Sequence, residues 1–160
     1  MTDYAVARRN MVSGQIRPNK VTDEAVLFNY VGLQTVDSLY MIRVCRDIAH
    51  GRFAPPFSEA KPDMTRRGFI SFVFDGRYKF ARYYAPDNFN TPGTLQALLA
   101  NNEIELFDLK TDPDKMNNLG VDVEANKDLI LRMNALLNRM IAKEVGKNDG
   151  RFLPPDLRSS

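Results

Sequence analysis

Three basic side chains lie close together in one short stretch of the sequence: Arg77, Lys79 and Arg82. Neighbouring cations on a strand can face an anionic ester or a phosphate backbone, because their fields add over the width of one ligand. Charged strand residues also keep one face of a sheet solvated. The residue types alone leave both interpretations open.

The densest group of carboxylates is Asp108, Asp112 and Asp114. A hard cation such as calcium or magnesium needs several oxygen ligands on a rigid frame. The same residues form a turn without a metal, because Pro113 pre-sets φ and the Asp112 side chain can accept from backbone amides two residues on. We expect a turn here rather than a cation site.

The chain has one histidine, His50, and one cysteine, Cys45. His50 stands beside Gly51 at the predicted end of a helix, where interaction with the helix dipole is expected over general acid-base chemistry. Cys45 falls in the apolar pattern of the same helix and is predicted to be a plain helix residue. A single cysteine excludes an internal disulfide and a zinc site built from several cysteines.

Length and composition describe an ordinary globular chain. Its 160 residues amount to about one domain, and 44% of them are hydrophobic. The formal charge of +2 is too small to predict nucleic-acid binding. No apolar run is long enough for a membrane span, and residues 1–10 contain no signal-peptide core, so we expect a cytoplasmic protein without membrane contact.

Helix and breaker signals divide the chain. Apolar spacing with a cap at Asp37 or Ser38 and a stop at Gly51 predicts one helix, and Thr22 with Asp23 predicts another that begins near Glu24. The remaining short elements are a helix over residues 5–16, a linker over 52–63, a short helix over 95–99 and a strand over 103–109. A long helix is expected last, ended by Gly146, and its apolar stripe consists of Leu129, Met133, Leu136, Leu137, Met140 and Ile141.

The basic residues belong to a predicted hairpin with strands over 69–74 and 78–84. Asp75-Gly76 is expected as its two-residue type I′ turn, which pairs Phe74 with Arg77, Phe72 with Lys79 and Val73 with Tyr78. Alternation then places Ile70, Phe72 and Phe74 on one face, and Phe69, Val73, Tyr78, Phe80 and Tyr84 on the other. Two aromatic faces imply a covering layer on each side.

The stretch from Glu105 to Leu119 reads ELFDLKTDPDKMNNL. It resembles the E-L-Y-D-L-x-x-D-P-x-E-x-x-N-L signature near the C-terminus of sulfatases, and residues 67–69 and 74–84 resemble the hairpin that precedes it. The resemblance covers about Phe28 to Gly150. One departure is Lys115, which stands where the family usually has glutamate.

The resemblance implies a C-terminal subdomain that lies against a catalytic domain and helps to shape its pocket rim. It makes Arg77, Lys79 and Arg82 the substrate-rim candidates. Sulfatases use a formylglycine made from a cysteine or serine, but the sequence has no Cys-x-Pro-x-Arg or Ser-x-Pro-x-Arg segment. No catalytic residue and no metal ligand is therefore expected here, and a divalent cation such as calcium would belong to the catalytic domain.

A second resemblance lies in the segment from Thr2 to Leu27. Residues 7–12, 15–17 and 19–23 resemble the start of protein-L-isoaspartate O-methyltransferases. Such an enzyme needs a glycine-rich turn that lets the backbone approach S-adenosylmethionine, and no such turn follows.

We therefore expect an α+β fold, with a small antiparallel sheet of three or four strands packed on a long C-terminal helix and preceded by short helices. The expected division is a helical segment over residues 1–27, a sulfatase-like subdomain over 28–150 and a tail over 151–160. The expected function is that of the C-terminal part of a sulfatase, a sulfuric ester hydrolase, without catalysis in this chain. A methyltransferase relic and a non-enzymatic interaction module are the alternatives. The expected partners are a sulfatase catalytic domain or a second copy bound through the hairpin face.

Overall fold

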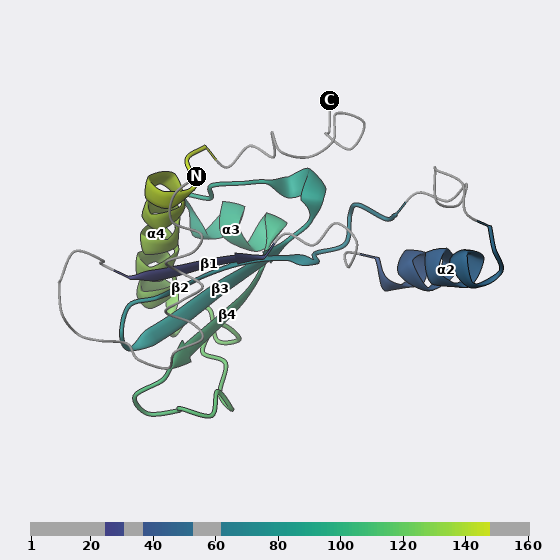
Figure 1. Ribbon diagram of the computed structural model, residues 1–160. Helices are drawn as coiled ribbons and strands as arrows, with labels where there is room; N and C mark the ends of the chain where they lie inside the picture. The colour runs from purple at the N-terminus through teal and green to yellow at the C-terminus, as the bar shows by residue number, and fades with distance from the viewer. Residues whose placement is uncertain (1–24, 31–36, 53–61, 148–160) are drawn as a thin grey trace.

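The computed structural model describes residues 25–30, 37–52 and 62–147. In these ranges a four-stranded antiparallel sheet carries the long C-terminal helix on one side, which confirms the expected α+β fold (Figure 1). The helix predicted over residues 5–16, most of the predicted linker and the predicted tail lie outside the described residues. The elements are β1 (Val26–Tyr30), α2 (Ser38–Ala49), β2 (Phe69–Phe74), β3 (Tyr78–Tyr84), the 3-10 turn η1 (Pro86–Asn88), α3 (Leu95–Asn101), β4 (Glu103–Asp108) and α4 (Lys127–Glu144).

The strands lie in chain order, β1-β2-β3-β4, and every neighbouring pair is antiparallel. One row of apolar residues crosses all four strands on the side that faces α4. In this row Leu27 pairs with Val73, Val73 with Phe80, and Phe80 with Leu106.

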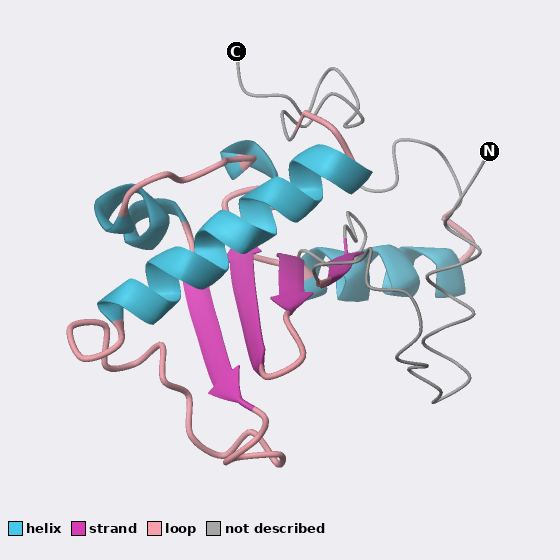
Figure 2. Ribbon diagram, turned by 90° about the vertical axis from the view of Figure 1, so that its left-hand side faces the viewer, coloured by secondary structure: helices cyan, strands magenta, loops and turns pink. Residues whose placement is uncertain are grey.

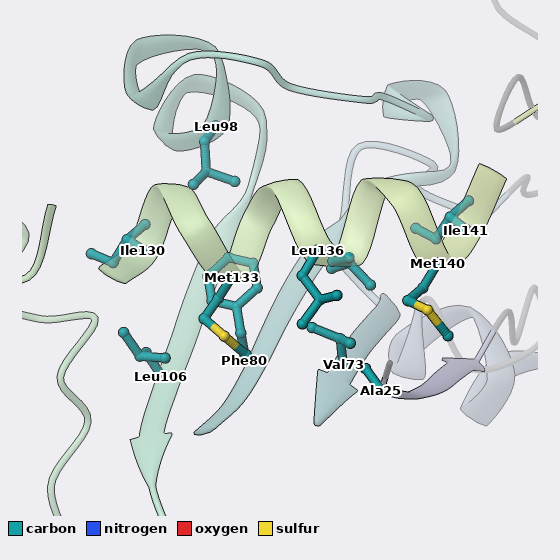
Figure 3. Packing of buried hydrophobic residues seen from close by; sticks show 11 residues of the cluster. Ala25, Val73, Phe80, Leu98, Leu106, Ile130, Met133, Leu136, Met140 and Ile141 are labelled. Atoms are coloured by element: carbon teal, nitrogen blue, oxygen red, sulfur yellow. The ribbon is translucent and has the colours of Figure 1, made fainter. Parts of the chain in front are cut away.

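The core forms where α4 crosses that row (Figure 3). Five residues of the predicted stripe are buried, Met133, Leu136, Leu137, Met140 and Ile141, together with Ile130, while Leu129 is partly buried. Leu98 of α3 joins the same cluster, so α3 and α4 share one side of the sheet (Figure 2). The helix ends as predicted, with Gly146 at φ +94° just after Val145.

The helix predicted to begin near Glu24 is wrong, because residues 26–30 form β1. Leu27 packs against the core, and Phe28 pairs with Phe72 of β2. Alternation of sides along the strand satisfies both contacts, which outweighs the capping signal of Thr22 and Asp23. The predicted boundary between residues 27 and 28 therefore falls inside β1.

The hairpin is confirmed, but its predicted pairing is wrong by two residues. Phe74 pairs with Lys79 and Val73 with Phe80, so the two turn residues are Gly76 and Arg77. The carboxylate of Asp75 is the cause: its Oδ1 accepts from the backbone N–H groups of Arg77 and Tyr78, at 2.9 and 2.7 Å. Positive φ falls only on Gly76, at +98°, as in a type II′ turn.

A shift of two residues leaves every side chain on its predicted face. Phe69, Val73, Phe80 and Tyr84 are buried on the α4 side, whereas Ile70, Phe72 and Phe74 are half-buried on the opposite side. The prediction of two apolar faces is confirmed in its assignment of residues.

Helix α2 begins and ends as predicted. Asp37 is its N-cap and accepts from the N–H groups of Leu39 and Tyr40, and Gly51 follows its end at φ +72°. The helix is set apart from the sheet (Figure 1). Of the described helices, none is both long and apolar enough to cross a membrane.

Truncation of Leu137 tests the helix-on-sheet core. Leu137 is fully buried. Leu137→Ala should lower the free energy of unfolding by about 2–5 kcal/mol, because transfer and cavity costs add. Urea denaturation followed by circular dichroism measures the loss. Leu99→Ala is the control, since Leu99 is 39% exposed and should lose far less. Equal losses in the two variants would contradict this assignment of the core.

Candidate functional site

The structure does not bring the three substrate-rim candidates together. Arg77 lies in the hairpin turn, while Lys79 and Arg82 point to opposite faces of β3. Residues separated by an odd number of positions in a strand always face opposite sides. Arg77, Lys79 and Arg82 therefore cannot surround one ligand.

Arg77 is held by an ion pair at the end of β4. Its Nε and Nη2 donate to the two carboxylate oxygens of Asp108, at 3.0 and 2.7 Å. This pair lowers the pKa of Asp108 to about 2, with the hydrogen bonds from Arg77 as the main cause. The same hydrogen bonds raise the pKa of Arg77. The bidentate geometry fastens the hairpin turn to the start of the sulfatase-like signature.

Arg82 is buried between the sheet and α4, with 1% of its surface exposed. Its Nη1 donates to the side-chain oxygens of Asn134 and Asn138, at 2.9 and 2.7 Å. Both amides donate in turn to the carbonyl of Pro92. Burial lowers the pKa of Arg82 to about 10. The guanidinium ties β3, α4 and the segment before α3 together, so its role is structural.

The signature forms a loop that is fastened back onto β4. Asp112 accepts from the backbone N–H groups of Met116 and Asn117, at 3.0 and 2.8 Å. Asn118 Oδ1 accepts from Leu106 and Gly120, both at 2.9 Å. The carboxylates of Asp108 and Asp112 are thus used by an arginine and by backbone amides, as the turn interpretation expects. Within the described ranges, no three His, Cys, Asp or Glu side chains gather in a group that could hold a metal.

His50 lies at the end of α2 and Cys45 lies within it. His50 is the C-cap, and its Nδ1 lies 2.7 Å from the carbonyl oxygen of Arg46. Cys45 is an exposed helix residue. Both positions agree with the structural roles expected from the sequence.

The side of the sheet away from α4 is the candidate site, and we call it the open face. Helices α3 and α4 lie on the other side of the sheet, and α2, the remaining described α-helix, is set apart from the strands (Figure 1). Cross-strand partners define its members, which are Val26, Phe28, Tyr30, Ile70, Phe72, Phe74, Lys79, Ala81, Tyr83, Glu103, Glu105 and Phe107.

Aromatic contacts organise the middle of the open face. The rings of Phe28 and Phe72 stack with centroids 4.8 Å apart, and the Lys79 ammonium lies 4.7 Å from the centre of the Phe72 ring. In the described part of the chain Lys79 has no carboxylate partner. A cation held over a ring is well placed to meet an acidic group on a docked surface.

The open face changes character from one edge to the other. On β1 and β2 it is apolar, and Val26 and Tyr30 are 47% and 44% exposed. On β4 it carries Glu103 and Glu105. Glu105 accepts from the Tyr83 hydroxyl at 3.1 Å. Burial is the main reason that the pKa of Tyr83 rises to about 12, and the negative charge of Glu105 is the second.

A shallow hollow extends the acidic edge towards α3. It is lined by Arg67, Tyr83, Leu99, Asn102, Glu103, Ile104, Glu105, Asn118 and Gly120. Its polar side chains are already engaged in part: Arg67 pairs with Glu103 at 3.5 Å, and Asn118 bonds the backbone. The hollow therefore suits a polar side chain of a docking partner better than a buried substrate.

Sequence reasoning missed the contribution of β1 to this site. The helix predicted to begin near Glu24 left no predicted strand at Phe28 and Tyr30. The alternation of Val26, Phe28 and Tyr30 was the signal that could have placed them on one face of a strand.

Two comparisons with known proteins were negative. Neither the protein-family models nor the curated proteins contain a match to this chain.

The ion pair of Asp108 predicts a specific acid sensitivity. The folded pKa of about 2 lies below the ordinary value of 3.8, so this carboxylate stabilises the fold above pH 3.8 and loses that effect as the pH falls towards 2. Urea midpoints measured between pH 2 and 7 should fall less steeply in Asp108→Asn than in the wild type. Asp114→Asn, at an exposed turn position, is the control and should keep the wild-type slope. Identical slopes in all three proteins would refute the ion-pair assignment.

Proposed function

We propose that this chain is a sulfatase-type C-terminal subdomain that binds a protein partner and does not itself hydrolyse sulfate esters. The partner is a sulfatase-type catalytic domain, and the docking surface is the open face. The observation that carries the proposal is this half-buried aromatic face on a sheet whose other face packs against α3 and α4 and, at Phe69 and Tyr84, against Phe89.

Side chains alternate between the two faces of a sheet. A sheet with one helix layer needs apolar residues on one face only. Here the second face also carries Phe28, Ile70 and Phe72, which are half-buried without a described helix above them. Burial of about 200 Å² of such a surface would contribute about 5 kcal/mol before the costs of association.

The residues of the signature support the same function. Asp108, Asp112 and Asn118 each hold the chain in place rather than a ligand. Arg77 is paired and Arg82 is buried, so Lys79 is the one rim candidate that could face a partner. A subdomain with this arrangement would supply a surface, while the nucleophile and a cation such as calcium would come from the catalytic domain.

Docking can be tested with an arylsulfatase catalytic domain from which its own C-terminal subdomain has been deleted. Calorimetric titration should give saturable binding to this chain. The double variant Phe72→Ser with Phe74→Ser should raise the dissociation constant at least about tenfold, since buried aromatic anchors dominate such interfaces. Met116→Ser with Val121→Ser is the matched control, because both residues are more than 80% exposed and lie off the open face.

The result that opposes this proposal is equal affinity of the two double variants, or no binding by the wild type. Circular dichroism of Phe72→Ser with Phe74→Ser shows whether the fold survives. If this variant unfolds, Lys79→Glu takes its place in the titration. Lys79 lies on the same face, and its substitution reverses a charge without removing an apolar side chain.

Catalysis is tested separately with an aryl sulfate. The purified chain should show no turnover, with or without added calcium, because the covalent route requires a formylglycine nucleophile. Turnover that survives repurification and disappears in a variant of this chain would overturn the non-catalytic role.

A further inference from the structure

Helix α2 carries apolar side chains that no described element covers. Leu39, Ile42 and Ile48 are 54%, 64% and 41% exposed, and only Val44 is buried among the residues of this helix. Leu39 and Ile42, three positions apart, share one side of the helix, whereas Ile48, nine positions from Leu39, lies on another. An amphipathic helix normally buries its apolar side against another surface. Helix α2 and the half-buried open face are therefore two apolar surfaces on the same chain over which no described element lies.

The two surfaces match in size. A helix of 12 residues is about 18 Å long, while β2 and β3, with 6 and 7 residues, extend about 20–23 Å. Helix α2 can lie along these strands over its whole length. Helix-on-sheet contact of this kind would repeat on the open face what α4 does on the other side.

The two surfaces also match in charge. Helix α2 carries two exposed arginines, Arg43 and Arg46. The open face carries Glu103, which pairs with Arg67 at its exposed edge, and Glu105, which accepts from Tyr83, along β4 beside its apolar half. Arg43 lies one turn from Leu39 and Arg46 one turn from Ile42, so a helix that seats Leu39 and Ile42 on the aromatic residues can direct an arginine towards the acidic edge.

The N-cap of α2 favours the open face of a second copy over that of its own chain. Asp37 is 8% exposed and accepts from the backbone N–H of Asp63 at 3.0 Å, and its Oδ1 lies 3.7 Å from Arg66 Nε. These contacts anchor the start of α2 to the segment that leads into β2. Anchored there, the helix extends away from its own sheet (Figure 1).

We infer that α2 of one copy docks on the open face of a second copy, and that the second copy returns the same contact. The result is a two-fold symmetric dimer with two equivalent helix-on-sheet contacts. The inference rests on the proposed function only in using the open face as a protein-binding surface. Because one face cannot hold both, the dimer and the complex with a catalytic domain exclude each other.

Disulfide capture tests the geometry, because Cys45 is the only cysteine and is exposed on α2. Val26→Cys and Tyr30→Cys place a second thiol at either end of β1 on the open face. Under mild oxidation at least one of them should give a reducible dimer well above the yield of Val121→Cys, an exposed control off the open face. The dimer yield of the wild type measures how often a disulfide forms between the Cys45 residues of two copies.

Two outcomes of this capture would overturn the inference. The first is a yield no higher than that of the control and the wild type. The second is a fast-migrating, reducible monomer band, which would mean that α2 closes on its own sheet. Mass spectrometry of the linked peptides distinguishes these products from the expected pair, Cys45 with the introduced thiol.

Sedimentation tests the energetics without a cross-link. Leu39→Ser with Ile42→Ser should raise the dimer dissociation constant at least about tenfold, whereas Met116→Ser with Val121→Ser should leave it unchanged. Arg43→Glu and Glu103→Arg should each weaken the dimer, and the combined variant should recover part of the loss if their charges face each other. A wild type that stays monomeric at high concentration would refute the dimer.

The failure of this inference is distinguishable from failure of the proposed function. The variant Leu39→Ser with Ile42→Ser keeps an intact open face, so it should bind the catalytic domain at least as tightly as the wild type. Binding of that domain by a wild type that is monomeric would reject the dimer and keep the docking role. If the wild type dimerises and neither it nor the variant Leu39→Ser with Ile42→Ser binds the catalytic domain, the docking role is rejected and the dimer is kept.

Discussion

The row of apolar side chains under α4 is the constraint on which the rest of the molecule depends. Leu27, Val73, Phe80 and Leu106 each come from a different strand, and they lie side by side because the three ladders share one register. Helix α4 crosses them with a stripe of six buried apolar residues. Once these side chains face α4, alternation sends every neighbouring residue to the open face. The chemistry of the open face is therefore a consequence of the core.

Polar groups inside the molecule hold this arrangement in one position. Within the described ranges Arg82 is buried beside two asparagines and pairs with no carboxylate, and the asparagines bond the carbonyl of Pro92. A buried charge without an ionic partner is costly, and its lowered pKa reflects that cost. Apolar contacts alone permit α4 to slide or rotate over the sheet. The directional bonds of Arg82 select one position of the helix.

The sulfatase-like signature is explained by its own structure. Asp108 bonds an arginine and Asp112 bonds backbone amides, while the Asn118 side chain bonds the backbone of Leu106 and Ile104 along β4. Lys115 adopts φ +56°, a left-handed conformation. These contacts give the residues of the signature a part in folding the loop. The apolar area without a described covering element lies elsewhere, on the open face and on α2.

Local signals in the sequence were sufficient for the hairpin, the caps of α2, the end of α4 and the apolar stripe of the long helix, since each depends on residues within a few positions of one another. One failure was local: Asp75 moves the hairpin turn because its carboxylate bonds the amides of Arg77 and Tyr78, two and three positions on, a bond that the Asp-Gly turn signal does not include. The other failures arose where distant groups decide the outcome. Residues 26–30 form a strand because β2 offers a free edge, and Arg82 is buried because asparagines of α4 meet it. The sequence by itself determined which residues are apolar and at what period, whereas the tertiary structure decided their partners, because pairing energies come from contacts between segments far apart in the chain.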